Sequence, residues 1–506
     1  MSGSGAKTTK GQPNVSQNLR RRDFLKTAAS TALVAAGASA APPLAGGKHP
    51  NLVFVFPDEM RGQAVGILNE DPVITPNLDA MAREGLILPE AVSTYPVCSP
   101  YRAMFMTGRY PHSNRVLSNC TNRWADNNCE LQEADRCWSD VLSDQGYSLG
   151  YIGKWHLDAP RKPYIDCANN RGKTKWNEWC PPNRRHGFDF WYSYGTYDHH
   201  LKPMYWSTKA TRDGFKYVEQ WGPEHEADTA IKYIRNEGGA YRKPDRPFAL
   251  VVSMNPPHMP YHLVPDRYKE LYKDTPVEQL CNRPNVPAAD TRWGKHYRRH
   301  VKNYFSGVTG VDDQFGRIVK AIDDAGLGED TIIVFTSDHG DCLGIHEKQT
   351  KNNRFEESMR IPFLVRWKGK IKPRRDDLLL STPDIYPTLL DLMGFGEAIP
   401  KQVEGVSLAA VFLTGKGERP ASQLYMRANP QQPQYGPRGV RTHDWKLVVT
   451  KRKDRPTQTY LYDRKSDPYE MASVADTRPE KVKELTAELE RWLKKTNDPW
   501  LEQARP

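Results

Sequence analysis

The sequence predicts an α/β fold, in which helices flank a large mixed, mostly parallel sheet and a small C-terminal antiparallel sheet carries a helix. Short apolar runs recur along the chain, and each stops at polar residues, as buried parallel strands do. Helical stretches lie between these runs. After about residue 422 the pattern changes to shorter strand-like segments that an amphipathic helix follows.

Four apolar runs are the predicted strands of the large sheet, at residues 52–56, 148–153, 248–254 and 331–335. Polar segments follow them directly, namely Asp58-Glu59, Lys154-Trp155-His156, Asn255-Pro256-Pro257-His258 and Ser337-Asp338-His339-Gly340. One polar strand end is ordinary. Four that carry carboxylates, histidines and a lysine indicate a shared site, because ligands of open α/β sheets bind outside the carboxyl ends of the strands.

Helix and strand signals between and after these runs complete the prediction. Thr75 is the expected N-cap of a helix with Pro76 at its first position, and a further strand is expected at residues 361–365. In the C-terminal region, residues 445–449 and 459–462 read as strands. A last helix starts at about Pro479.

The last helix shows two further patterns. Thr477 and Glu480 have the spacing of a capping box. One face of the helix is apolar and must pack on something, and it consists of Val482, Leu485, Leu489, Trp492 and Leu493.

Length and composition fit a soluble globular protein. The chain has 506 residues, 38% of them hydrophobic and 26% charged, and no apolar run is long enough to span a bilayer. We predict a signal segment and linker at residues 1–47, a catalytic domain at 48–420 and a C-terminal subdomain at 421–506.

The N-terminal residues resemble a twin-arginine export signal. Arg20-Arg21-Arg22-Asp23-Phe24-Leu25-Lys26 precedes a mild apolar run, and Ala38-Ser39-Ala40 provides small residues for cleavage. The alternative is a disordered basic tail. An export signal implies the twin-arginine export machinery as a partner and a periplasmic or secreted mature protein.

Charge suits an anionic substrate without proving one. Residues 1–40 hold six basic residues and one acidic residue, a net +5, so +6 of the formal +11 belongs to the remainder. Basic clusters at residues 372–375 and 451–455 lack interleaved aromatic residues, so we interpret them as solvated faces and expect no nucleic-acid partner.

Eight cysteines in an exported protein suggest some disulfides. Without Cys98 seven remain, so at least one stays free. Pairing of Cys167 with Cys180 is one possibility. A second is a pair within the group Cys120, Cys129 and Cys137. No C-x-x-C pair exists to support a zinc ribbon.

Cys98-Ser99-Pro100-Tyr101-Arg102 has the form C-x-P-x-R and continues into Met106-Thr107-Gly108-Arg109. The simplest alternative for a lone cysteine is a small buried hydrophobe. This stretch instead resembles the signature of the type I sulfatases. Further landmarks follow the family order, namely residues 75–79, 153–156, 255–260, 337–340, 461–463 and 467–468. The resemblance implies an alkaline-phosphatase-like sulfatase fold with a four-stranded C-terminal subdomain.

The resemblance also implies a mechanism. Cys98 is oxidised to formylglycine by a maturation enzyme, and one hydroxyl of the hydrated aldehyde attacks sulfur while the other later expels sulfate. Arg102 would hold this diol. His156 and His258 match the histidines that activate the diol and protonate the leaving group, with the two roles unassigned. His112, His262 and His346 are weaker candidates.

Two lysines match those that contact sulfate oxygens in the family. They are Lys154 and Lys351, and Lys348 competes with Lys351 for the second position. The alternative is that these are ordinary exposed loop residues, because most lysines in folded proteins are exposed.

A divalent-cation site is implied at Asp58, Glu59, Asp338 and His339, together with Cys98. Hard oxygen ligands favour Ca²⁺, with Mg²⁺ possible. The family commonly has two aspartates where this chain has Asp58-Glu59. The longer Glu59 side chain either binds from another angle or lies behind the ligands.

An aromatic stretch at residues 188–200 ends in Asp198-His199-His200. Asp198 and His199 are predicted substrate-binding residues, because aromatic faces beside polar groups suit a sugar ring; packing in the core is the alternative for the aromatic residues. We therefore expect a sulfated carbohydrate substrate. Rival functions are a formylglycine-dependent phosphonate or phosphodiester hydrolase and a non-catalytic sulfated-glycan-binding protein. A phosphatase relative would use serine or threonine as nucleophile.

Overall fold

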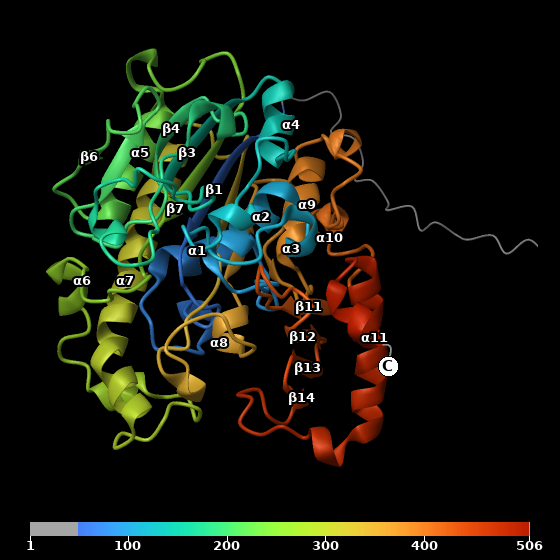
Figure 1. The fold of residues 1–506 in the computed structure, drawn as a ribbon. Coiled ribbons are helices and arrows are strands. Elements are labelled where there is room, and N and C mark those ends of the chain that lie inside the picture. Colours follow the sequence, from blue (N-terminus) through green and yellow to red (C-terminus); the bar gives the residue numbers. More distant parts are fainter. Residues whose placement is uncertain (1–48, 505–506) are drawn as a thin grey trace, which may run out of the picture. The chain divides into compact units, whose positions relative to one another are not determined.

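A computed structural model describes residues 49–504 of the chain (Figure 1). The export signal predicted within residues 1–47 lies outside this part. Among the helices that are described, none combines the length and the apolar character that a membrane crossing requires.

The large sheet has ten strands in the order β10-β2-β9-β8-β1-β7-β3-β4-β5-β6. The strands β8, β1, β7, β3 and β4 are mutually parallel, whereas β9 runs antiparallel to β8 and β5 antiparallel to β4. This confirms the predicted mixed, mostly parallel sheet. Its strands are β1 (Asn51–Pro57), β2 (Leu86–Ile87), β3 (Ser148–Lys154), β4 (Phe190–Tyr194), β5 (Met204–Ser207), β6 (Lys216–Tyr217), β7 (Phe248–Met254), β8 (Thr331–Thr336), β9 (Phe363–Arg366) and β10 (Arg374–Arg375).

Helices cover both faces of this sheet. Figure 1 shows α5 and α7 on one face and α2, α4 and α9 on the other. The helices are α1 (Pro76–Glu84), α2 (Cys98–Thr107), α3 (Pro111–Asn114), α4 (Trp138–Asp144), α5 (Gly222–Arg235), α6 (Asp266–Glu270), α7 (Arg292–Asp324), α8 (Glu356–Met359), α9 (Ile385–Leu392), α10 (Ala409–Thr414) and α11 (Pro479–Lys495).

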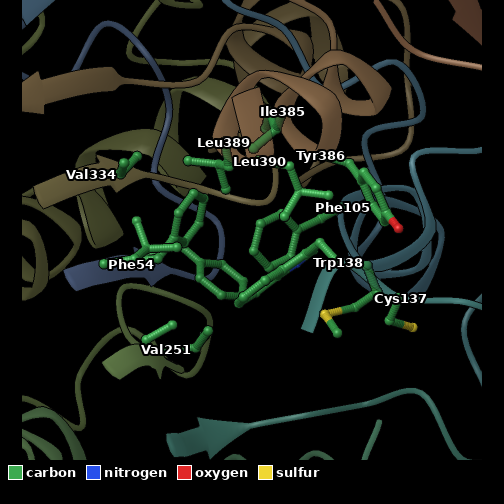
Figure 2. Close-up of a cluster of buried hydrophobic side chains, with 14 of the residues drawn as sticks. Phe54, Phe105, Cys137, Trp138, Val251, Val334, Ile385, Tyr386, Leu389 and Leu390 are labelled. Carbon is green, nitrogen blue, oxygen red and sulfur yellow. The ribbon is translucent and has the colours of Figure 1, made fainter. Parts of the chain in front are cut away.

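The double cover explains why the central strands are apolar without interruption. Successive strand side chains point to opposite faces, so Phe54 of β1 packs in the core beneath α2, α4 and α9, and Val55 packs in the core beneath α1, α5 and α7. Figure 2 shows Phe54 among Phe105, Trp138 and Leu389, which belong to α2, α4 and α9. Truncating such a buried phenylalanine to alanine costs about 3–5 kcal/mol.

The C-terminal region forms a second, antiparallel sheet in the order β11-β12-β13-β14. Its strands are β11 (Gln423–Met426), β12 (Gly436–Arg441), β13 (Trp445–Arg452) and β14 (Arg455–Asp463). Leu485, Leu489 and Leu493 of α11 pack on this sheet in one cluster that also contains Met104 of α2. The apolar face of the last helix is thus confirmed. The domain boundary at residue 420 stays a prediction.

Local details differ from the sequence predictions. The capping box of α11 is wrong: Arg478 precedes the helix, and the Thr477 hydroxyl donates to the Val474 carbonyl oxygen instead of capping. The Thr75 hydroxyl makes no cap bond either; it accepts from the Gly66 N–H and donates to Asp79. The strand expected at 361–365 begins at Phe363, because Pro362 has no N–H for a ladder bond.

The cysteines are all free, so the suggested disulfides are wrong. The Cys167 sulfur accepts a hydrogen bond from Asn177 at 3.6 Å. The Cys180 thiol lies 3.6 Å from the carbonyl oxygen of Arg184. Both side chains are buried. These cysteines therefore act as small buried side chains with local polar partners.

Candidate active site

The polar ends of four adjacent strands meet at one edge of the large sheet. Asp58 follows β1, Lys154 ends β3, Asn255 follows β7 and Asp338 lies two residues after β8. The order β8-β1-β7-β3 is continuous and parallel, so these ends lie side by side as the sequence predicts. Gly153 is required before Lys154, because its φ is +94° and a Cβ there would lie 2.1 Å from the Ser253 carbonyl oxygen.

Helix α2 brings Cys98 and Arg102 to the same place. Cys98 is its first residue, and its Sγ lies 3.3 Å from Nε2 of His339 and 3.7 Å from Oδ1 of Asp58. Arg102 lies one turn later on the same helix face. Its guanidinium donates to Asp58 and Asp338, each at 3.1 Å.

Two lysines add positive charge around Asp58. Lys154 Nζ lies 2.7 Å from Oδ2 of Asp58 and donates to Oδ1 of Asn255 at 3.0 Å. Lys351 Nζ lies 3.7 Å from Oδ1 of Asp58 and 3.4 Å from Oε2 of Glu59. Lys348 is exposed, so the geometry favours Lys351. We call the group defined by Asp58, Glu59, Cys98, Arg102, Lys154, Asp338, His339 and Lys351 the strand-end cluster.

The charged groups of the cluster shift one another's pKa values. Burial alone would raise the pKa of Asp58, but the ammonium groups of Lys154 and Lys351 lower it well below its ordinary value. Burial and the neighbouring Asp58 raise the pKa of Asp338. Burial and Asp58 also raise the pKa of the Cys98 thiol to about 11.

Glu59 is held in an unusual position for a carboxylate. Its backbone has φ +71°, and its side chain is fully buried with no hydrogen-bond donor to either oxygen among the described residues. Burial raises its pKa to about 8 even though the Lys351 ammonium lowers it. A buried carboxylate without donors is costly unless a cation compensates it.

These ligand atoms fit a divalent cation. Suitable atoms of Asp58, Cys98, Asp338 and His339 lie within 4.8 Å of one another, and Glu59 forms a second such group with Asp58 and His258. The first group offers two carboxylates and an imidazole beside Cys98, and the second adds the carboxylate of Glu59; carboxylate oxygens are the ligands that hard cations prefer. The Glu59 oxygens, which accept no hydrogen bond from the described residues, are consistent with such a site.

The two candidate histidines lie at the rim of the cluster. The His258 ring has Nε2 3.5 Å from Oε2 of Glu59 and Nδ1 2.7 Å from the Met259 carbonyl oxygen. His156 is buried, has φ +52° and has no hydrogen-bond partner at either ring nitrogen within the described part. Burial and the Lys154 ammonium hold the pKa of His156 well below its usual range, and burial and Lys351 do the same for His258.

Other predicted residues lie at greater distance. Asp198 is partly exposed and accepts from Asn169 and from Asn255 at 3.2 Å, and its Oδ1 lies 3.6 Å from His258 Nδ1. His199 is exposed and has no polar contact with the cluster. The aromatic residues of 188–200 pack in hydrophobic cores, which was the alternative to a role in sugar binding.

The weaker histidine candidates have other surroundings. His112 pairs with Asp498, the His346 ring stacks on Phe355, and His262 is exposed. None of the three contacts the strand-end cluster.

Sequence reasoning assigned no role to two residues of the site. The Asn255 amide bridges Lys154 and Asp198, and the Ser253 hydroxyl accepts from Arg102 at 2.8 Å. Asn255 stands directly after a predicted strand, which is a usable signal. Ser253 lies inside a buried strand and offers none.

Comparison with known proteins places this geometry in a family. Residues 50–395 match the family model described as Sulfatase, and residues 344–498 match that of the C-terminal region of N-sulphoglucosamine sulphohydrolase. An endo-4-O-sulfatase of Bacteroides thetaiotaomicron is 39% identical over 485 residues, covering 90% of this chain and 93% of its own length. An ulvan-active sulfatase of Formosa agariphila is 30% identical, covering 89% and 82%.

A solved structure shows the same fold. A crystal structure from Bacteroides fragilis, assigned as the sulfatase yidJ, superposes with a TM-score of 0.87 at 50% identity, over 90% of this chain and 97% of that one. Since the family matches extend over both sheets and the C-x-P-x-R segment opens the helix at the strand ends, the chain belongs to the formylglycine-dependent sulfatases of the alkaline-phosphatase superfamily and is a sulfuric ester hydrolase.

Proposed function

We propose that this chain hydrolyses sulfate monoesters on carbohydrate, through a formylglycine formed from Cys98. The proposed mechanism also uses a divalent cation, for which the ligands favour calcium over magnesium. The observation that carries the proposal is the set of three cationic side chains around position 98, namely the buried Arg102 and Lys154 and the partly buried Lys351. Fixed positive charge in a dry site stabilises the sulfate oxygens as charge develops during ester cleavage.

Each group at the site has a task in this proposal. Lys154 and Lys351 orient the sulfate, and Arg102 holds the nucleophile that the hydrated formylglycine supplies. Asp58, Asp338 and His339 would hold the cation, with Glu59 beside them, and a bound cation would supply further positive charge against the sulfate. His156 and His258 are neutral near pH 7, so each can accept or donate the proton that moves to the leaving alcohol.

The carbohydrate assignment rests on the relatives and on the rim of the site. Two relatives are named for endo-4-O-sulfatase and ulvan-active sulfatase activity. Asp198 lies at the rim, partly exposed and next to His258, where it can accept from sugar hydroxyls. His199 stands further out and would contact only a larger substrate.

Export completes the proposal. The twin-arginine sequence at residues 20–26 supports passage through that machinery to the periplasm or beyond. A formylglycine-generating enzyme of the host is the second partner, because conversion of the Cys98 thiol to an aldehyde is a two-electron oxidation with loss of the sulfur, and that enzyme must use an external oxidant.

The test uses the full chain produced together with a formylglycine-generating enzyme. Inorganic sulfate is measured after incubation with sulfated polysaccharides, the released alcohol is measured after incubation with phosphonate and phosphodiester esters, and Cys98→Ala is the control. Sulfate release that Cys98→Ala abolishes supports the proposal. Faster cleavage of the phosphonate would replace it with the rival hydrolase, and glycan binding without release would leave a glycan-binding protein.

A further inference from the structure

A cleft of about 510 Å³ lies where the C-terminal sheet meets the segments that carry the active-site residues. Its walls come from residues 427–437 and 450–453 on one side and from Tyr95, Ser118, Trp124 and Asn352 on the other. We call it the basic cleft, because Arg427, Lys451, Arg452 and Lys453 line it and none of the described lining residues is an aspartate or a glutamate. Its volume falls in the range of about 300–1,000 Å³ that ligand sites occupy.

The cleft adjoins the active site through the backbone. Asn352 follows Lys351, and its N–H donates to the Pro96 carbonyl oxygen at 3.0 Å, two residues before Cys98. The side-chain oxygen of Asn352 is buried and has no donor among the described residues. A sugar hydroxyl could satisfy it.

The wall of the cleft is built in advance. The Tyr95 hydroxyl donates to the carbonyl oxygens of Leu117 at 3.0 Å and Ala428 at 2.9 Å, and so ties the two sides together. Trp124 and Tyr435 are only partly buried and present aromatic surface to the cleft. Aromatic faces beside cations suit a charged sugar.

The cations of the cleft are unpaired, which distinguishes them from an ordinary basic surface. The exposed side chains of Arg427, Arg452 and Lys453 have neither an ion pair nor a hydrogen bond with the part of the chain that the structure describes. Lys451 differs, since its ammonium donates to the Trp500 carbonyl oxygen and lies over the Trp500 ring.

The second basic cluster of the sequence shows the contrast. Arg374 donates to the Phe412 carbonyl oxygen at 2.9 Å and lies 3.4 Å from Asp376. This cluster lies on β10, at the edge of the large sheet and four strands away from β1. Of the two basic clusters, the one at residues 451–455 lies beside aromatic side chains in the cleft. These aromatic side chains belong to residues outside the cluster's own segment.

We propose that the basic cleft binds a second anionic sugar unit of the same glycan chain, one that carries a sulfate or a carboxylate next to the unit being cleaved. This inference rests on the proposed function and extends it from a sulfated sugar to a polyanionic chain. Arg427 and Arg452 pair with the anionic group, and Trp124 or Tyr435 stacks on the ring.

The test compares two double variants that each remove two exposed cations. Arg427→Ser/Arg452→Ser alters the cleft, and Lys372→Ser/Arg375→Ser is the matched control on the distant edge. Each is made in wild type and in Cys98→Ala. Thermal unfolding checks that the variants fold.

Binding is measured by calorimetry in the Cys98→Ala background with dextran sulfate, carboxymethyl dextran and neutral dextran. We expect the cleft variant to weaken dextran sulfate binding about three- to tenfold and the control to leave it unchanged. If the protein with an intact cleft binds carboxymethyl dextran and the cleft variant binds it more weakly, the cleft also accepts a carboxylate. Equal losses in both variants, no loss in either, or equal binding of neutral dextran would overturn the proposal.

Turnover separates this proposal from the proposed function. In active protein the cleft variant is expected to raise KM for a sulfated polysaccharide by a similar factor, with kcat and the turnover of 4-nitrophenyl sulfate unchanged. Sulfate release with an unaltered KM in the cleft variant would contradict the cleft proposal and leave the proposed function intact. Binding in the cleft without any sulfate release would contradict the proposed function and leave the cleft proposal intact.

Discussion

Two buried clusters of charge in this protein differ in how their charges are satisfied. One is the strand-end cluster. The other, which we call the interface network, joins the C-terminal sheet to the segments around β2 and α8 and consists of Glu90, Glu356, Arg441, Lys446, Arg464 and Glu470. In the interface network the Arg441 guanidinium donates to both oxygens of Glu356, at 3.0 and 2.8 Å.

One glutamate from each cluster, Glu356 and Glu59, expresses this difference in its pKa. Burial would raise the pKa of Glu356, but Arg441 and Lys446 hold it well below its ordinary value. Glu59 in the strand-end cluster has no donor, and its pKa rises to about 8. The hydrogen-bonded Glu356 helps to join the C-terminal sheet to α8, whereas the Glu59 oxygens accept no hydrogen bond from the described residues and are available for a ligand. Burial alone does not distinguish the two.

The largest expected effect is on Cys98. Cys98→Ala should lower kcat for sulfate release by at least about a thousandfold, because the nucleophile is removed. Its free energy of unfolding should change no more than that of Cys180→Ala, another buried free cysteine. Both are measured by sulfate release and by urea unfolding. Substantial activity in Cys98→Ala would contradict the assignment.

The second prediction compares two lysines, the buried Lys446 and the partly buried Lys351. Lys446 donates to the Arg354 carbonyl oxygen and to Glu356, whereas Lys351 has no hydrogen-bond partner among the described residues. Lys446→Met should cost about 3 kcal/mol of stability, since it leaves the buried Glu470 carboxylate without its ion-pair partner. Lys351→Met should instead lower kcat/KM about a hundredfold.

Urea unfolding and steady-state kinetics on both lysine variants measure these effects. The expected result is a crossed pattern, with stability lost in one variant and activity in the other. Equal effects of the two variants on stability and activity would remove the distinction between the clusters.

Removal of the cation should affect only the strand-end cluster. A chelator is expected to abolish activity and lower Tm, and calcium should restore both, because an ion present at about a hundredfold its Kd stabilises the fold by about 2.7 kcal/mol. Asp338→Asn should lose the response to calcium and Lys446→Met should keep it. Differential scanning fluorimetry measures Tm, and an activity assay measures turnover, each with and without chelator. An unchanged Tm and activity would contradict the cation site.

A smaller effect concerns acid pH in the interface network. Burial raises the pKa of Glu90, but Arg441 and Arg464 lower it from 4.5 to about 2. A lowered pKa in the folded state stabilises the fold above the unfolded pKa, and this contribution is lost as pH falls from about 4.5 to about 2. Glu90→Gln should flatten the decline in stability over this range. A wild-type slope in the variant would show that Glu90 contributes nothing to acid unfolding.

Much of the fold could be predicted because its central strands are buried on both faces. Such strands are continuous apolar runs, and the polar residues at their ends mark the site. Strands β11 and β12 were not identified, because β11 has four residues and β12 contains Gly436, Pro437 and Gly439, which disfavour strands.

The site could be predicted in composition but not in contacts. Residue types at the strand ends pointed to Asp58, Lys154 and Asp338. The choice of Lys351 over Lys348 depends on burial, which the loop sequence does not show. The basic cleft could not be predicted from the sequence, because its cations lie more than 300 positions from Tyr95 and Trp124 on the opposite wall.

The most direct test of the account is the mass of the tryptic peptide from Glu84 to Arg102, from the full chain produced with a formylglycine-generating enzyme. Conversion of the Cys98 thiol to an aldehyde makes the peptide about 18 Da lighter and reactive toward hydrazide, whereas thiol oxidation adds mass. We predict the lighter, reactive peptide in every preparation that releases sulfate. Sulfate release by protein whose Cys98 is wholly unmodified would contradict the account.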